Sequence, residues 1–320
     1  MIRRLLTIAS FCLVIVSCSE DFNPYGNEVN KYVLNCIVRA DTNYQTAIVS
    51  KSYIVDNLDP YSSTTDPNVY NATVRIYNGD NFAQLTDTLI TRQSSNYKTP
   101  YLIYQTRNFY PDSNAPVKVE AILPNGETLS GTTKLAQKAD YYKVENTIPP
   151  EKDNDVIFIW DVDKIVNAFL PRFAINYYKA DESPKVKHTF YVPLQYINDG
   201  GKDYPLYEKV TADNFLDLSM ETIDKAMHLL SDGDPDKGNY IILDCTFEVF
   251  TLDKNLSDYY NSTNRGNDIY SVKLDESDFT EVSGAYGVVG SFAKNSWQVR
   301  FTHTYIMSFD YTPGLADVTK

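Results

Sequence analysis

The sequence has few of the residues on which most catalytic and metal sites depend. Its 320 residues include only 3 histidines and 4 cysteines, and no two histidines have the spacing of a metal-binding pair. It also lacks the Gly-x-Ser-x-Gly turn of many hydrolases and a glycine-rich loop that could hold a phosphate. These absences argue against a zinc enzyme, a hydrolase with that turn and a nucleotide-binding protein. Carboxylates are so numerous that no pair stands out as a glycosidase acid and base.

Basic residues are scarce relative to acidic ones. The chain has 29 Lys and Arg against 42 Asp and Glu, which gives a net charge of −13. Such an acidic chain is poorly suited to binding nucleic acid or an anionic bilayer surface. We therefore expect no nucleic-acid partner.

The chain has no apolar run long enough to span a membrane, but it begins with a shorter one. Residues 5–16 are apolar except for Thr7 and Ser10, and they follow Arg3 and Arg4. About 12 residues fall short of the roughly 20 that a spanning helix needs. A charged start followed by a short apolar segment is typical of a secretory signal, which we place at residues 1–17.

The end of this segment carries a recognisable tetrapeptide. Ile15-Val16-Ser17-Cys18 resembles the bacterial lipobox, in which cleavage precedes a cysteine that is then acylated. The resemblance implies a membrane anchor at Cys18, because each buried methylene of an acyl chain contributes about 0.8 kcal/mol. The alternative is an ordinary cleaved signal with an incidental cysteine. The following Ser19-Glu20-Asp21 looks like a surface-export signal of Bacteroidota lipoproteins, or else belongs to a solvated acidic tether at 18–27.

Two further cysteines remain after the signal. Cys36 and Cys245 are far apart, and each lies in an apolar, β-like run. Exported proteins can form disulfides, so a bridge between domains is one alternative. Two thiols on interior strands of different domains are more often buried and unpaired, which is what we expect.

The region 28–138 has the pattern of an immunoglobulin-like or prealbumin-like β-sandwich. Short runs rich in β-branched and aromatic residues alternate with turns, and Asn78-Gly79 and Pro124-Asn125-Gly126 are hairpin signals. The seven expected strands cover residues 32–38, 46–55, 72–77, 83–90, 101–105, 117–122 and 128–132.

The region 139–320 predicts a second, fibronectin-like β-domain with one inserted helix. The helix is expected near 219–231, with Ser219 as N-cap and one apolar face that includes Ile223 and Met227. Residues 211–218 have partly helical character. The expected strands cover residues 156–160, 173–179, 189–192, 240–252, 269–274 and 297–309.

One loop has the composition of a cation-binding site. Asp232, Asp234 and Asp236 stand at alternate positions and could supply oxygens to calcium. However, an EF-hand requires Gly where Lys237 stands and Glu where Leu243 stands. An ordinary turn rich in Asp, Gly and Pro is therefore the favoured interpretation, with calcium as the weaker one.

Tyrosine is abundant, with 26 residues. Most tyrosines lie in strand-like runs, where tyrosine is simply a good β-former. Tyr204, Tyr207, Tyr259 and Tyr260 lie outside such runs, and we take them as candidates for ligand contact. Exposed tyrosines can stack on sugar rings or anchor a peptide.

The last third of the chain carries a family resemblance. Three ordered motifs are found at 256–261 (Leu-Ser-Asp-Tyr-Tyr-Asn), 266–270 (Gly-Asn-Asp-Ile-Tyr) and 282–291 (Val-Ser-Gly-Ala-Tyr-Gly-Val-Val-Gly-Ser). Together with the lipobox and Ala72-Thr73-Val74, they resemble an uncharacterised family of Bacteroidota outer-membrane lipoproteins with a domain of unknown function. Ala285 and Val289 depart from the family's glycine and phenylalanine.

Three glycines in the last motif have a physical interpretation of their own. Gly284, Gly287 and Gly290 recur every three residues, which suits positive φ or close backbone approach in a folded loop. No strand leads through them into a helix, so they do not form a nucleotide loop.

The resemblance implies a function, because genes of this family often lie beside those of TonB-dependent receptors. We therefore expect a lipid-anchored, non-catalytic binding or accessory subunit in the outer membrane, associated with a β-barrel transporter and without a cofactor. A surface adhesin or assembly subunit is the alternative. A hydrolase ranks third and would require paired carboxylates with perturbed pKa values.

Overall fold

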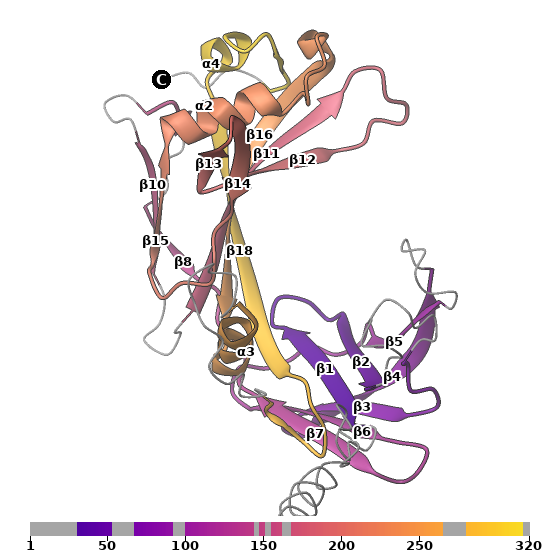
Figure 1. Ribbon diagram of the computed structural model, residues 1–320. Coiled ribbons are helices and arrows are strands. Elements are labelled where there is room, and N and C mark those ends of the chain that lie inside the picture. Colours follow the sequence, from indigo (N-terminus) through magenta and orange to yellow (C-terminus); the bar gives the residue numbers. More distant parts are fainter. Residues whose placement is uncertain are drawn as a thin grey trace, which may run out of the picture.

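The computed structural model describes residues 31–52, 67–91, 100–143, 147–150, 155–161, 168–264 and 280–315. Within them the chain is mainly β and forms two sandwich-like halves with one helix inserted in the second (Figure 1), which confirms the expected fold class. The signal, Cys18, the acidic tether and the strand expected at 269–274 lie outside the described residues.

The first half contains all seven expected strands. One sheet has the order β1-β2-β5-β4 and the other β4-β3-β6-β7, so β4 pairs in both sheets. Alternating residues such as Val117, Val119 and Ala121 of β6 are buried between the sheets. The strands are β1 Tyr32–Arg39, β2 Gln45–Lys51, β3 Thr73–Asn78, β4 Asn81–Ile90, β5 Tyr101–Thr106, β6 Val117–Ile122 and β7 Thr128–Thr133.

The second half packs the sheet segment β12-β11-β16-β18 against the three-stranded sheet β15-β10-β8. Its core is aromatic: the Phe158 ring stacks on Phe247 with centroids 4.2 Å apart. The remaining strands are β8 Asp140–Lys143, β9 Thr147–Ile148, β10 Asp155–Asp161, β11 Ala168–Lys179, β12 His188–Val192, β13 Gln195–Asp199, β14 Lys202–Leu206, β15 Phe215–Ser219, β16 Tyr240–Leu252, β17 Val282–Ser283, β18 Val289–Phe301 and β19 Thr312–Pro313.

The inserted helix is present as α2, Met220–Leu229, followed later by the short 3-10 turn η2, Lys237–Asn239. The Ser219 hydroxyl accepts a hydrogen bond from the Thr222 backbone N–H at 3.2 Å, as expected of an N-cap. Ile223 and Met227 are buried against the second core. The predicted helix is therefore confirmed with its cap and apolar face.

Three other expectations need correction. Residues 215–219 form β15 rather than a helix, because Leu216 and Leu218 are buried in alternation and pair with β10. The strand expected at 297–309 ends at Phe301, where the Thr302 hydroxyl caps α4, His303–Met307. The segment around Tyr259 and Tyr260 forms α3, Lys254–Asn264, which the sequence pattern did not indicate.

Strand β18 belongs to both halves of the molecule. Its first residues pair in parallel with β1 from Cys36 to Arg39, and the strand then pairs with β16 in antiparallel register. Figure 1 shows it running in yellow from one half into the other. Val282 and Val289 lie in the first core, although residues 139–320 were expected to form the second domain. The second segment thus returns to complete the first sandwich.

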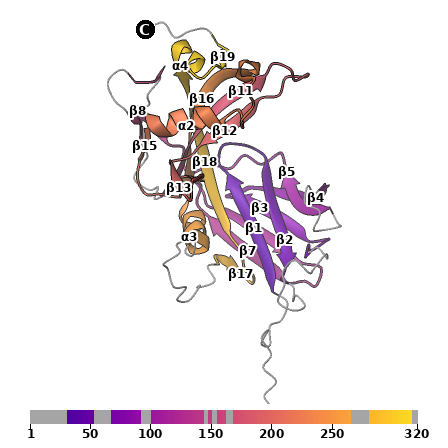
Figure 2. The same cartoon turned by 45° about the horizontal axis from the view of Figure 1, so that its top comes forward.

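A partly buried carboxylate stabilises this junction. Asp253 accepts hydrogen bonds from the backbone N–H groups of Ser291 (2.8 Å) and Leu256 (3.1 Å), and from the Thr133 hydroxyl. The Ser291 hydroxyl in turn donates to the Lys134 carbonyl at 2.7 Å. Burial raises the pKa of Asp253, while these hydrogen bonds oppose the shift. Figure 2 shows the result: α3, which begins after Asp253, lies beside β18.

The three glycines of the C-terminal motif lie where the chain enters β18. Gly284 and Gly287 have φ values of +80° and +113°. A Cβ on Gly287 would overlap the Leu34 carbonyl oxygen and lie 2.7 Å from Asn35 Oδ1. A Cβ on Gly290 would lie 2.9 Å from that of Leu256. Each position therefore excludes a side chain, through backbone conformation or close approach.

We predict that Gly287→Ala strongly destabilises the protein. The matched control is Gly126→Ala, because Gly126 also has positive φ (+87°) but has open space around its Cβ position. The control should lose about 1 kcal/mol of unfolding free energy through backbone strain alone. Gly287→Ala should lose about 3 kcal/mol or more, because the β1 backbone must also move. Urea denaturation measures both, and equal losses would contradict the close approach.

The two remaining cysteines, Cys36 and Cys245, are free and fully buried, so the expectation that they are unpaired is confirmed. Burial raises the pKa of Cys36 to about 12 and also raises that of Cys245. We predict that neither thiol is alkylated by iodoacetamide in the folded protein, because little thiolate forms. Both should react in denaturant without a reductant, as mapped by peptide mass spectrometry. A requirement for reductant would reveal a disulfide instead.

Candidate functional site

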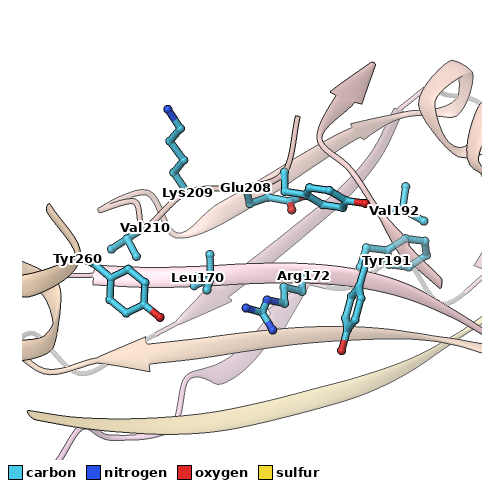
Figure 3. Close-up of a pocket in the computed structure, with 10 residues that line it drawn as sticks. Leu170, Arg172, Tyr191, Val192, Glu208, Lys209, Val210 and Tyr260 are labelled. Carbon is cyan, nitrogen blue, oxygen red and sulfur yellow. The ribbon is translucent and has the colours of Figure 1, made fainter. Parts of the chain in front are cut away.

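A pocket of about 480 Å³ opens beside β11 in the second half (Figure 3). It is lined by residues from β11, from β12, from the segment between β14 and β15, and from α3. These are Leu170, Arg172, Phe173, Tyr191, Val192, Tyr207, Glu208, Lys209, Val210 and Tyr260.

The pocket forms where the edge of β11 is left without a continuous partner. Strand β12 pairs with β11 from Phe173 onward and ends at Val192. The later segment returns to the same strand at Thr211, which exchanges two backbone hydrogen bonds with Phe169 (2.7 and 2.9 Å). Pro171 stands between these pairings and has no N–H to donate. Its position accounts for an opening at this point of the ladder.

One end of the pocket is apolar. Leu170, Val210 and Tyr260 pack around a small cluster that includes Leu252 and Leu256. Figure 3 shows these three lining residues together at one end, while Arg172 and Tyr191 lie toward the other. The apolar end is built on α3, whose first turn is fixed by the Asp253 carboxylate.

The other end carries a guanidinium group. Arg172 lies 4.9 Å from the ring centroid of Phe250 and 5.8 Å from that of Tyr191. These rings orient its planar group by cation–π contact. Among the described residues, its N–H groups have no hydrogen-bond partner, so the donors are available to a ligand.

Glu208 enters the same space from the neighbouring segment. Its Oε1 atom is buried and has no hydrogen-bond partner within the described part of the chain. Burial raises the pKa of this carboxyl group to about 7, against the opposing effects of its own backbone N–H and the charge of Arg172. Near neutral pH the group is therefore present in both protonated and ionised forms, and it forms no ion pair with Arg172.

The structure brings two of the four tyrosine candidates into this pocket. Tyr207 and Tyr260 line it, whereas Tyr259 is packed edge-on to Tyr260 and Tyr204 lies exposed on β14 beneath Lys202. Sequence reasoning missed the other lining residues, among them Arg172, Tyr191 and Glu208. A charged residue and a proline inside the apolar run of β11 were the available signal.

The weak calcium candidate at Asp232, Asp234 and Asp236 stays a prediction, and the structure gives Asp234 a role in the turn itself. Asp234 Oδ1 accepts from the Asp236 backbone N–H at 2.9 Å, and its Oδ2 accepts from the Tyr240 hydroxyl at 3.1 Å. Across the described ranges, no three metal-ligating side chains converge in a way that could hold an ion. The Asp234 carboxylate stabilises the turn between α2 and β16 through these two hydrogen bonds.

We predict that Glu208→Gln changes how stability depends on pH. The pKa of Glu208 is higher in the folded protein than its value near 4.5 in the unfolded chain. The stability that Glu208 contributes is therefore complete below about pH 4.5 and is lost as the pH rises through about 7. Glutamine cannot ionise. The free energy of unfolding of the variant, relative to that of the parent, should therefore rise by on the order of 2 kcal/mol between about pH 5 and about pH 8. Urea denaturation at both pH values, with the exposed Glu127→Gln as control, tests this; parallel profiles would contradict it.

Comparison with known proteins does not identify a relative. No protein-family model and no curated protein matches the sequence. Solved structures that align with it include the ectodomain of mouse nectin-like molecule 4 (12% identity, TM-score 0.18, covering 85% of this chain and 66% of that one). Another is the C-terminal globular domain of an oligosaccharyltransferase from Pyrococcus abyssi (11%, TM-score 0.18, covering 86% and 50%). The chain thus spans about two thirds and half of these structures, and such low TM-scores carry no argument about fold or function.

Proposed function

We propose that the protein is a lipid-anchored, non-catalytic binding subunit of the outer membrane that serves a TonB-dependent transporter as an accessory component. The observation that carries the binding function is the pocket beside β11, which combines an apolar end with two charged groups that do not pair with each other. An unsatisfied buried polar group is costly unless a ligand satisfies it.

The chemistry of the pocket supports binding rather than catalysis. Glu208 is the one carboxyl group among its lining residues. Hydrolysis of a glycoside by the usual route requires two carboxyl groups on either side of the bond. The lining residues also include no serine, cysteine or histidine that could act as a nucleophile or its base.

The location rests on Cys18 and on the family resemblance. The lipobox-like tetrapeptide supports acylation, and Ser19-Glu20-Asp21 supports export to the cell surface. In the described part of the chain, no helix is long and apolar enough to cross a membrane. The partnership with a β-barrel receptor is what the family resemblance implies.

A surface adhesin or assembly subunit is the second candidate. The observation in its favour is strand β4, along which Phe82, Leu89 and Ile90 are exposed. Exposed apolar side chains on one strand are typical of protein contacts. Self-association of the purified protein would favour this candidate, whereas recovery of a β-barrel receptor from native membranes would favour the first.

The anchor gives the most direct test. We predict that Cys18→Ala moves the protein from the membrane fraction to the soluble fraction, because the acyl chains that hold it are lost. Ser19→Ala is the matched control and should stay with the membrane. Protection of Cys36 and Cys245 from alkylation shows that the released protein is folded. Retention of Cys18→Ala on the membrane would reject the anchor.

The transporter association has its own experiment. Affinity purification of the acylated protein from detergent-solubilised native membranes should recover a β-barrel receptor. Recovery without any β-barrel protein would reject the accessory role. Protease treatment of intact cells then decides the orientation, because a fully protected protein cannot face the cell surface.

A further inference from the structure

The two ends of the pocket differ in chemistry. Leu170, Val210 and Tyr260 present apolar surface at one end, and Arg172 and Glu208 bring polar groups toward the other (Figure 3). A ligand that satisfies both ends must combine an apolar body with a polar group. The charges of the pocket then decide which polar group fits.

We propose that this pocket binds a small apolar molecule that ends in a carboxylate, with the carboxylate between Arg172 and Glu208 and the apolar body against Leu170. This inference rests on the proposed binding function and names its class of ligand. Fatty acids, aromatic acids and the carboxyl end of an apolar amino acid share this chemistry.

Arg172 is suited to a carboxylate. Its guanidinium is held against Phe250 and Tyr191, and its donors have no partner among the described residues. A planar guanidinium binds a carboxylate through two parallel hydrogen bonds, and stacking on aromatic rings reduces the freedom lost on binding. The site therefore offers an oriented cation in a chain whose net charge is −13.

Glu208 fits the same ligand in its neutral form. The buried Oε1 atom has no partner in the described ranges of the chain, and a protonated carboxyl group can donate a hydrogen bond to an incoming carboxylate. Hydrogen bonds of this O–H···O⁻ type are short and strong. The titratable and charged groups that line the pocket with Glu208 are Arg172 from β11, Tyr191 from β12 and Tyr260 from α3, with Tyr207 and Lys209 beside it in the chain. Among them, Arg172 is the charged group that acts on its pKa.

Other ligand classes satisfy the pocket less well. An ammonium group would be repelled by Arg172, which already occupies the polar end. A neutral sugar could accept hydrogen bonds from Arg172 but would leave its charge uncompensated and would place hydroxyl groups against Leu170 and Val210. A carboxylate with an apolar body leaves neither mismatch.

The experiment is calorimetric titration of the full chain carrying Cys18→Ala, so that neither acyl groups nor detergent competes for the pocket. Octanoate is the probe, with octanol and octylammonium as neutral and cationic counterparts. Octanoate should bind at least about tenfold more tightly than either counterpart. Its affinity should fall about tenfold between about pH 6 and about pH 8, because binding the ionised form of Glu208 requires uptake of a proton.

Three variants test the assigned contacts. Arg172→Gln should weaken octanoate binding about tenfold or more, whereas Lys185→Gln should change it little. Both remove one positive charge, but Lys185 is exposed in the turn between β11 and β12 and does not line the pocket. Glu208→Gln keeps a neutral donor and should therefore bind octanoate with the pH dependence removed. Because Glu208→Gln leaves the sheet untouched, it remains informative if Arg172→Gln fails to fold.

Several results would overturn the inference. These are equal binding of octanol, tighter binding of octylammonium, no binding of octanoate, or a pH dependence that persists in Glu208→Gln. N-acetyl-leucine, tested in parallel, distinguishes a peptide carboxyl end from an aliphatic acid, and tight binding of either supports the shared chemistry. The titrations involve no membrane or receptor, so their failure is distinct from failure of the anchor or of the transporter association.

Discussion

The pairing of β18 on both sides is the constraint on which the rest of the structure depends. The strand aligns in parallel with β1 at its start and in antiparallel register with β16 thereafter. It places Val289 in the first core and Val299 in the second. Because side chains alternate along a strand, a slip of one residue would turn both sets away from their cores. One register therefore fixes two hydrophobic cores at once.

The partly buried carboxylate of Asp253 extends this constraint toward the pocket. It holds the Ser291 backbone in β18 and, through the Leu256 N–H, also fixes the first turn of α3. The second turn of that helix carries Tyr260, which closes the apolar end of the pocket. The position of a pocket residue thus follows from the junction between the two halves. A carboxylate is suited to this role because it accepts several hydrogen bonds at once.

Local patterns predicted the elements that are specified locally. The seven strands of the first sandwich follow from alternation and turn residues, and α2 follows from Ser219 and its apolar face. Helix α3 was missed because its sequence is polar and its buried residue Leu256 packs on distant strands rather than forming a stripe. Arg172 and Glu208 were missed for a similar reason. They meet because Thr211 bridges back to Phe169, and no local pattern encodes that pairing.

The pocket breaks the rule that buried polar groups are satisfied, and this makes it informative. Among the residues that the structure describes, one Glu208 oxygen has no partner, in a site where burial disfavours its charge, and the donors of the nearby Arg172 are also unused. Had the two groups simply stabilised the fold, a direct ion pair would have satisfied both. Their separation leaves a place for a group that accepts hydrogen bonds from both. Sequences tolerate such local conflicts chiefly at functional sites, and here the cost to the fold falls when the ligand arrives.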